Sequence, residues 1–396
     1  MRASQTLKRW ATCAASLSAL VLAGCAGLNS AAPAAPVPEH LFHDAWFQPP
    51  AEPVRADAVL ALSPAMRAFM VSDIAHLARR ENSPQRALIQ ALYTPNLLRL
   101  EYDASMTRDA AQAFDARSGN CLSLVLMTAA FAHALDLEVN FHSADSEETW
   151  SRRGNLLVRS SHVNVSLGPR LMSQGTRRDP ALLTVDFLPA QDLQGLRTRD
   201  IGQATVLAMY FNNRAAESLV QGQFDQSYAF AREALRQDPT FLPAYNTLGL
   251  VYRRHGQPAQ AAATFEHVLA LDPTQRQAMA NLIDTDDELG RTAQARQWRA
   301  ALARLEPYPP FYFLQLGQAA ARRGDWPAAL VLFKRELARA DYAAEVHFWV
   351  AQADLQLGDP VSARRHLALA AENSLSGGER ALYSAKLDRL NAARHP

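Results

Sequence analysis

The sequence lacks an excess of charge of either sign. It has 40 Lys and Arg against 39 Asp and Glu, so the formal net charge of the 396 residues is +1. A nucleic-acid-binding protein usually needs a strong basic excess, so the sequence predicts no nucleic-acid partner. It also lacks a long apolar run near its start, because the stretch 11–22 is too short to span a bilayer comfortably.

The first 25 residues have the order of a secretory signal. The apolar stretch follows Arg2, Lys8 and Arg9 and is followed by Leu-Ala-Gly-Cys at residues 22–25. This tetrapeptide resembles the lipobox of bacterial lipoproteins, which implies cleavage after residue 24, lipid on Cys25 and a formal net charge of −2. Ala26, in place of an aspartate, indicates the outer membrane, facing the periplasm. An ordinary cleaved signal with a chance cysteine is the alternative.

Cysteine is scarce, and the sequence has only three. Cys13 leaves with the signal and Cys25 carries the lipid, so Cys121 is the one free thiol of the mature chain. No internal disulfide is then possible, although the cell envelope favours disulfides. A single thiol in a chain that also contains histidines is a candidate nucleophile.

Cys121 follows a Gly-Asn turn and begins an apolar helical pattern that continues to Leu135. Asn120 is expected to cap the first turn, and the positive end of the helix favours the thiolate form of the cysteine. Thiolate is the nucleophilic form, so the position suits covalent catalysis. The alternative is that Cys121 is a small buried apolar residue.

Helical patterns at 41–116 precede the turn, and strands follow it. The expected strands are 138–142, 156–167 and 182–187, which gives an α+β domain with a small antiparallel sheet. His162 and Asp186 lie on consecutive expected strands, so they can meet across the sheet and complete a nucleophile, base and orienting group with Cys121. His142 is expected to lack a neighbouring strand that carries a carboxylate. A metal site using Cys121 with either histidine lacks a closely spaced ligand pair, and no metal or cofactor is predicted.

Gly-Asn-Cys at a helix start, His-Val-Asn-Val on one strand and Thr-Val-Asp-Phe on the next together resemble the transglutaminase-like superfamily. The resemblance covers about residues 95–190. It implies a papain-like core in which Cys121 is the nucleophile, His162 the base and Asp186 the orienting carboxylate. Asn120 or the neighbouring amides are candidate oxyanion donors. Many relatives have a tryptophan shortly after the histidine, where this chain has Val163 and Asn164.

The second half repeats with a 34-residue period from about residue 208. The segment 244–252 with Ala261, Phe265 and Asp272-Pro273 resembles the tetratricopeptide repeat. Small residues recur in register at Ala215, Gly249, Gly317 and Ala351, with Ile283 off pattern, and again at Ser227, Ala261, Ala295, Ala329 and Ala363. We therefore expect an all-α solenoid of about five repeats and a capping helix over 379–392.

Four segments follow from these patterns: a signal peptide at 1–24, a lipidated cysteine with a Pro/Ala-rich tether at 25–50, the α+β domain at 51–200 and the repeats at 205–396. The groove of the repeats offers polar residues that can hold a protein or an extended peptide: Asn212, Asn213, Asn246, Arg253 and Arg254. They can equally be ordinary solvated residues. The repeat aromatics Tyr245, Tyr252, Phe265, Phe313 and Phe333 are expected in the core.

Two functions fit this organisation. In the first, the protein is a lipid-anchored thiol enzyme, a peptidase or amidase if water resolves its acyl intermediate and a transglutaminase if an amine does. In the second, it is a non-catalytic scaffold of the cell envelope. Its repeats bind partners, and its α+β domain is a degenerate transglutaminase-like domain without catalytic activity.

Overall fold

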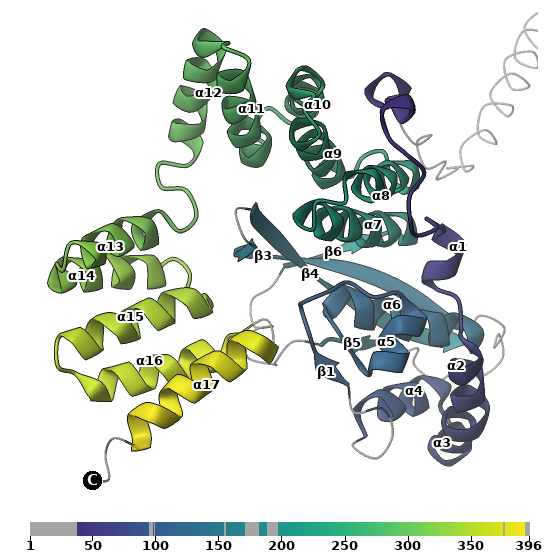
Figure 1. Ribbon diagram of the computed structural model, residues 1–396. Coiled ribbons are helices and arrows are strands. Elements are labelled where there is room, and N and C mark those ends of the chain that lie inside the picture. Colours follow the sequence, from purple (N-terminus) through teal and green to yellow (C-terminus); the bar gives the residue numbers. More distant parts are fainter. Residues whose placement is uncertain are drawn as a thin grey trace, which may run out of the picture. The chain divides into compact units, whose positions relative to one another are not determined.

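The computed structural model describes residues 38–94, 98, 100–153, 156–170, 182–187, 197–374 and 377–392 (Figure 1). The expected signal peptide, Cys25 and the tether up to residue 37 lie outside the described residues.

The helices before the Gly-Asn turn are short. They are η1 (Glu39–Leu41), η2 (Asp44–Trp46), α1 (Ala56–Val59), α2 (Pro64–Phe69), η3 (Met70–Ile74), α3 (Ala75–Glu81) and α4 (Pro84–Tyr93). Two of them begin with a serine cap followed by proline, as the sequence predicts. The Ser63 hydroxyl accepts from the amide of Met66, and Ser83 accepts from Arg86. Proline suits this position because its missing N–H would have no helical acceptor.

The segment from residue 38 to residue 52 is packed against the repeats. The Tyr252 hydroxyl donates to the carbonyl of Leu41 at 2.6 Å, and the Phe47 ring stacks on Tyr228 with centroids 3.9 Å apart. Arg232 pairs with Asp44 at 3.0 Å. The described part of the expected tether therefore has fixed contacts, in contrast to the solvated chain that its composition suggests.

The central helix is α6 (Cys121–Ala134), which follows β1 (Glu101–Tyr102), α5 (Ala110–Ala116) and β2 (Ser118–Gly119). Every residue of α6 from Leu122 to Ala132 is buried. A helix that is apolar on all sides belongs inside a protein. Its start at Cys121 agrees with the prediction.

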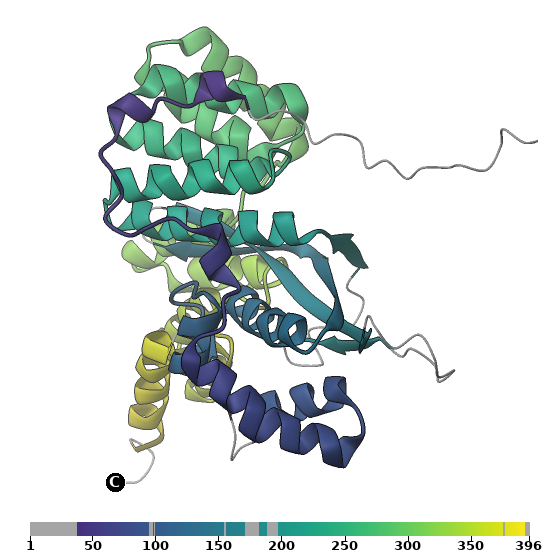
Figure 2. The same cartoon turned by 90° about the vertical axis from the view of Figure 1, so that its right-hand side faces the viewer.

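Within the described residues, β1 and β2 form a short parallel pair, and the larger sheet has four antiparallel strands in the order β5, β4, β3, β6. They are β3 (Leu137–Arg153), β4 (Leu156–Arg170), β5 (Leu183–Val185) and β6 (Arg197–Ile201). β4 alternates as predicted. His162, Asn164 and Ser166 share one face, and Val163, Val165 and Leu167 share the other, which belongs to the main buried core. Figures 1 and 2 show the sheet between α6 and α7. The strand β6 was not predicted.

The second half consists of helix pairs at the expected period. The helices are α7 (Gln203–Val220), α8 (Phe224–Gln237), α9 (Leu242–Arg254), α10 (Pro258–Leu271), α11 (Arg276–Glu288), α12 (Thr292–Leu305), α13 (Tyr312–Arg322), α14 (Trp326–Leu337), α15 (Ala344–Gln356), α16 (Pro360–Glu372) and α17 (Gly377–Ala392). The turn inside each pair holds a glycine at positive φ, and these glycines recur every 34 residues: Gly222, Gly256, Gly290, Gly324 and Gly358. Only glycine adopts this backbone conformation without strain.

The small residues in register allow two helices of a pair to approach closely. A Cβ on Gly249 would lie 2.4 Å from the ring of Phe265, and one on Gly317 equally close to Phe333. The irregular Ile283 has a simple explanation. Sixteen residues after it, where these two repeats have phenylalanine, this repeat has Arg299. Ile283 therefore does not face a phenylalanine ring of the kind that Phe265 and Phe333 present to Gly249 and Gly317, so its larger side chain is tolerated.

The buried core does not divide at the expected boundary near residue 200. One cluster of buried side chains runs from Leu41 through α6, the sheet and α7 as far as Leu282. In the described residues a second cluster begins at Phe311, and the stretch between the clusters contains Pro307, Pro309 and Pro310. Proline cannot continue a helix and restricts the residue before it. A third, small cluster consists of Ala351, Ala363 and Leu367. In the described residues, the buried side chains of the five repeats are therefore divided among three clusters, where the sequence predicts a continuous solenoid.

Candidate active site

The turn before α6 is built to hold the helix terminus. The Asn120 side chain accepts from the backbone amide of Ser123 at 2.9 Å and from the Ser123 hydroxyl at 2.8 Å, and it donates to the Thr107 hydroxyl at 2.9 Å. Gly119 is required here, because a Cβ would lie 2.7 Å from the Cβ of Ser123. The sequence therefore fixes Cys121 as the first residue of a capped helix.

His162 and Asp186 meet as predicted. The Nε2 atom of His162 lies 2.8 Å from both carboxylate oxygens of Asp186, and His162 is only 6% exposed. Two further residues hold Asp186, one at its carboxylate and one at its backbone carbonyl, and sequence reasoning missed both roles. Asn164 donates from Nδ2 to Oδ2 of Asp186 at 2.9 Å, and the Tyr93 hydroxyl donates to the Asp186 carbonyl at 2.7 Å. The alternation of β4 placed Asn164 on the same face as His162, which was the one available indication.

Cys121 is the third member of the cluster. Burial alone would lower the pKa of His162, but its hydrogen-bond and electrostatic interactions with the side chains of Asp186 and Cys121 raise this pKa to about 9. Since Nε2 faces Asp186, Nδ1 is the ring nitrogen available to the sulfur. Burial and the charge of Asp186 also raise the pKa of Tyr93 to about 12, so Tyr93 stays a neutral donor.

The arrangement has the parts needed for nucleophilic catalysis. A thiol at a helix N-terminus lies close enough to an imidazole to raise the pKa of that imidazole, and a carboxylate fixes the orientation and tautomer of the ring. The Asn120 side chain is engaged in capping, which leaves the backbone amides of Cys121 and Leu122 as the first-turn donors that the cap does not use. These two amides are the better candidates for oxyanion donors, and the oxyanion role itself stays a prediction.

A second His–Asp pair lies on the same face of the sheet. His142 Nδ1 is 2.7 Å from Asp200 on β6, and His142 Nε2 is 2.9 Å from the hydroxyl of Ser166, which also bonds the Thr184 hydroxyl at 2.8 Å. The expectation that His142 has no carboxylate strand beside it was wrong, because β6 was missed. Its sequence, Arg-Thr-Arg-Asp-Ile, has almost none of the apolar alternation typical of a strand.

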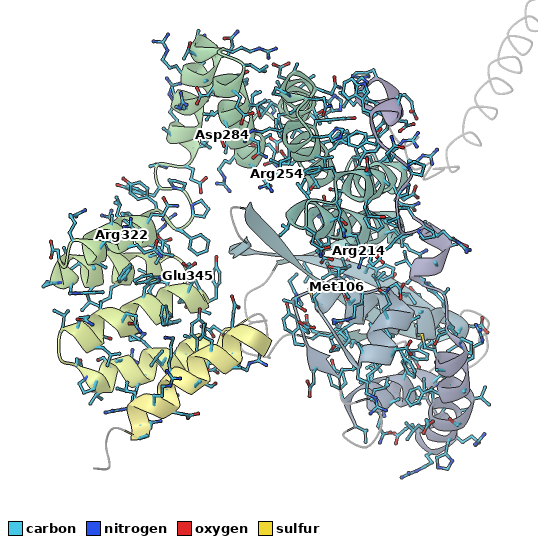
Figure 3. The ribbon with its side chains drawn as sticks, viewed as in Figure 1. Met106, Arg214, Arg254, Asp284, Arg322 and Glu345 are labelled. Carbon is cyan, nitrogen blue, oxygen red and sulfur yellow. The ribbon has the colours of Figure 1, made fainter. Side chains whose placement is uncertain are left out.

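Within the described ranges, no three His, Cys, Asp or Glu side chains cluster in a way that could hold a metal ion. The predicted groove residues differ in their environment. Arg253 pairs with Glu288 at 2.7 Å and with Asp284 at 3.3 Å, and Asn212 accepts from the Thr247 hydroxyl at 2.7 Å, so both link neighbouring repeats. Asn246 is buried, Asn213 is half-buried and Arg254 is exposed (Figure 3). Arg254 is therefore the most accessible of the five.

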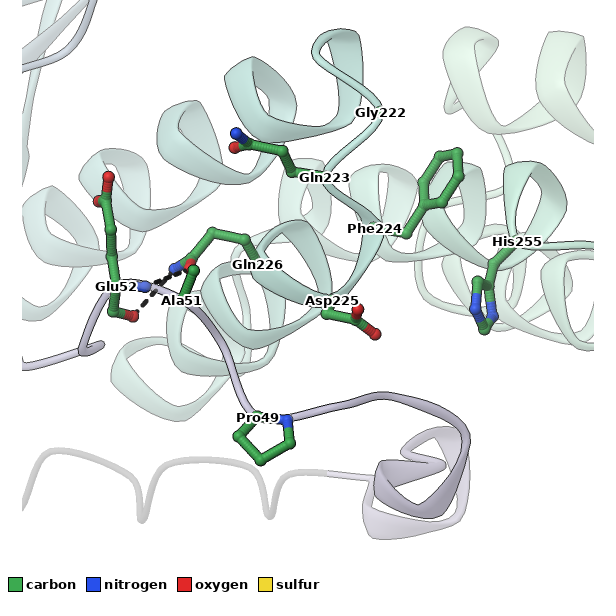
Figure 4. A pocket seen from close by; sticks show the side chains of 9 residues that line it. All are labelled: Pro49, Ala51, Glu52, Gly222, Gln223, Phe224, Asp225, Gln226 and His255. Carbon is green, nitrogen blue, oxygen red and sulfur yellow. Dashed lines mark hydrogen bonds between the residues drawn. The ribbon is translucent and has the colours of Figure 1, made fainter.

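The pocket in Figure 4 lies away from the triad. Its volume is about 350 Å³, and it is lined by the N-terminal segment at Pro49, Ala51 and Glu52 and by the first two repeats from Gly222 to Gln226 and at His255. None of the predicted catalytic residues lines it, so it does not bear on the thiol chemistry.

Comparison with known proteins identifies the repeats. Residues 243–275 and 310–335 each match a family model of the tetratricopeptide repeat. A stretch of 90 residues is 33% identical to Superkiller protein 3 of Schizosaccharomyces pombe, and it covers 23% of this chain but only 6% of that protein.

Solved structures show weaker similarity. The MamA protein is 18% identical over 44% of this chain and 93% of its own, with a TM-score of 0.25. A structure described as Pseudomonas aeruginosa pilF is 21% identical over 47% of this chain and 85% of its own, with a TM-score of 0.29. The family models and the helix pairs together show that the second half of this chain contains tetratricopeptide repeats, a protein-binding module, and that a mixed α/β region precedes them.

Proposed function

We propose that the protein is a lipid-anchored thiol enzyme of the cell envelope, with a papain-like domain of the transglutaminase-like kind, that acts on amide bonds of proteins or peptides. The observation that carries the proposal is the meeting of Cys121, His162 and Asp186 at the capped end of a buried helix. A surface histidine on a strand would need neither a buried carboxylate nor a neighbouring asparagine to hold that carboxylate.

The proposed reaction has two steps. In the first, the Cys121 sulfur attacks the carbonyl carbon of an amide, an S–C bond forms, and the oxyanion accepts from first-turn amides. The C–N bond then breaks, and His162 gives a proton to the leaving amine. In the second step, water or an amine loses a proton to His162 and attacks the thioester, and the S–C bond breaks to restore the thiolate.

Two products are therefore possible, depending on the acceptor. Water gives a peptidase or amidase, and an amine gives a transamidase. Hydrolysis is the leading proposal, because water is always present, whereas transamidation needs a bound amine. The tetratricopeptide repeats would bring a protein substrate or a partner of the envelope to the enzyme.

The test uses protein without residues 1–25. The rate at which iodoacetamide alkylates Cys121 is measured from pH 4 to pH 10 in this protein and in His162→Ala. We expect fast alkylation that persists well below pH 8.5, the pKa of an ordinary thiol, and that disappears in the variant. A peptide amide library with and without a fluorescent amine then separates hydrolysis from transamidation. A profile centred near 8.5 and unchanged by His162→Ala would refute the thiol enzyme.

The second candidate is a non-catalytic scaffold, which the repeat matches favour because they identify a protein-binding module and no chemistry. The scaffold hypothesis is favoured if the pH dependence of Cys121 alkylation is centred near 8.5 and is unchanged by His162→Ala. The lipid anchor and the outer-membrane location are tested separately, by fractionating cells that express the full chain or Cys25→Ser. We expect the full chain in the outer membrane and the variant outside it.

A further inference from the structure

The first repeat helix, α7, contacts the loop that holds the start of α6. This loop runs between β1 and α5 and includes Thr107, which is 1% exposed. The backbone amide of Thr107 donates to Oε1 of Glu217 at 2.8 Å, and its carbonyl accepts from Arg214 at 3.3 Å. Figure 3 shows Arg214 of α7 beside Met106, the neighbour of Thr107. Both backbone polar groups of one buried residue are thus held by α7.

The side chain of the same residue holds the cap of α6. The Thr107 hydroxyl accepts from the side-chain amide of Asn120, and the Oδ1 atom of Asn120 accepts from the backbone amide of Ser123. The next residue adds a second connection, because the amide of Arg108 donates to the Ser123 hydroxyl at 2.8 Å. A continuous path of hydrogen bonds therefore joins Glu217 to the first turn of the helix that begins with Cys121.

The N-terminal segment joins this path at its far end. Arg214 pairs with Glu52 at 2.8 Å, and the Glu52 backbone exchanges two hydrogen bonds with the side chain of Gln226 at 2.7 and 3.1 Å (Figure 4). The exposure of the two charged side chains differs, since Arg214 is 12% exposed and Glu52 is 64% exposed. The inner contacts to Thr107 should therefore matter more than the outer ion pair.

We propose that Glu217 and Arg214 of the first repeat are positioning residues for the nucleophile Cys121, acting through Thr107 and Asn120. The inference rests on the proposed thiol chemistry for its functional meaning. A misplaced helix terminus changes both the distance from sulfur to imidazole and the direction of the first-turn amides. In this arrangement the repeats form part of the support of the catalytic site, in addition to binding partners.

The first experiment compares Glu217→Ala, Glu217→Gln and Glu288→Ala in protein without residues 1–25. Glutamine retains the oxygen that accepts from Thr107, so Glu217→Gln should keep the Cys121 alkylation rate close to that of the unmodified protein. Glu288→Ala is the matched control, because it removes another repeat carboxylate, bound by Arg253, from a site that has no contact with Thr107. We expect alkylation of Cys121 at pH 6 to fall about tenfold in Glu217→Ala, to stay within about threefold in Glu217→Gln and to be unchanged in the control.

Hydrogen exchange of the peptide that covers the start of α6 provides a second readout, which does not depend on catalysis. We expect the Ser123 and Leu124 amides to exchange about tenfold faster in Glu217→Ala and at the native rate in Glu217→Gln. If Glu217→Ala fails to fold, Thr107→Val and Thr107→Ser replace it, because valine keeps the shape and removes only the bond to Asn120.

The two readouts separate two kinds of failure. Native exchange at the start of α6 in Glu217→Ala, or a Glu217→Gln protein as impaired as the alanine variant, would overturn the positioning role. An ordinary alkylation profile in the unmodified protein would instead remove the proposed enzyme, and the exchange measurement would still decide whether α7 positions the helix terminus.

Discussion

Asn164 donates from Nδ2 to Oδ2 of Asp186 at 2.9 Å, and its own Oδ1 is buried and has no hydrogen-bond partner among the described residues. A buried side-chain oxygen that accepts no hydrogen bond destabilises the folded protein. Asn164 is therefore stabilising only if the hydrogen bond from its Nδ2 contributes more than its unbonded Oδ1 costs. The Nδ2 group of Asn164 donates to the Asp186 carboxylate, and this carboxylate in turn bonds His162. The arrangement predicts that Asn164 is retained for the orientation of Asp186.

Asn164→Ala should therefore lower the pKa of His162 and reduce the alkylation rate of Cys121 at pH 6 about tenfold, the effect of one hydrogen bond to a charged group. The rate against pH, together with the imidazole titration of His162 by NMR, measures this. Ser166→Ala is the control, since Ser166 lies two residues away on the same face but bonds His142 and Thr184. Equal effects of the two variants would show that the sheet face is altered as a whole.

The raised pKa of His162 predicts a dependence of stability on pH. The group titrates near 6.5 in the unfolded chain and at about 9 in the folded one. Protonation thus favours the folded state. Its contribution is fully present below pH 6.5 and is lost as the pH rises through about 9. The upper limit of the loss is roughly 3 kcal/mol.

Urea unfolding at several pH values measures this loss directly. The unmodified protein should lose stability between pH 6.5 and 9, whereas His162→Gln should lack this slope because it has no imidazole to titrate. Asp186→Asn should show a smaller slope than the unmodified protein. Parallel curves for the unmodified protein and His162→Gln would mean that the imidazole does not gain a proton on folding.

Glu336 offers a test of whether the repeats after residue 310 unfold separately from the cluster that ends at Leu282. This carboxylate is 1% exposed and accepts from three backbone amides at the start of α13, those of Phe311, Phe313 and Leu314, at 2.8 to 3.3 Å. Glu336→Ala would leave these amides buried without an acceptor. We expect a loss of about 2–4 kcal/mol in the unfolding of α13–α16, with Cys121 alkylation unchanged.

Two thermal transitions followed by calorimetry would show this, with only the transition of the repeats after residue 310 moved downward by Glu336→Ala. Exposed Glu372→Ala on α16 is the control and should change stability by less than about 0.5 kcal/mol. A single transition that moves together with Cys121 reactivity would mean that these repeats and the cluster that ends at Leu282 unfold as one unit.

The sequence predicted the features that depend on short-range rules. The caps at Ser63 and Ser83, the start of α6 at Cys121 and the alternation of β4 follow from local chemistry, and the repeats follow from a period. The missed features depend on distant partners. Tyr93 reaches Asp186 across 93 residues, Thr107 reaches Glu217 across 110 and Leu41 reaches Tyr252 across 211. No local pattern marks such pairs, and the weakly apolar β6 gave no alternation to detect.

The same contrast applies to the expected boundary near residue 200, which stays a prediction. A change from strand to helix period near residue 200 suggests two modules, but burial decides whether a core divides. Helix α7 buries Val206, Ala208 and Phe211 in the same cluster as α6, so the first repeat completes the α/β region. The proline-rich stretch 307–310 lies between the cluster that ends at Leu282 and the cluster that begins at Phe311, and its composition was visible in the sequence.

Gly249 provides the sharpest test of repeat packing. A Cβ at this position would lie 2.4 Å from the Phe265 ring, which is fully buried, so alanine must displace the ring. Gly249→Ala should destabilise the protein by about 1–3 kcal/mol, although alanine is the better helix former. If the clash is the cause, Phe265→Leu should cost less in the alanine background than in the native one, which a double-mutant cycle by urea unfolding measures. Ala215→Gly is the reverse control, because this repeat already accepts a Cβ and should only lose helix propensity, about 1 kcal/mol. Additive costs for Gly249→Ala and Phe265→Leu would place the constraint elsewhere than in this contact.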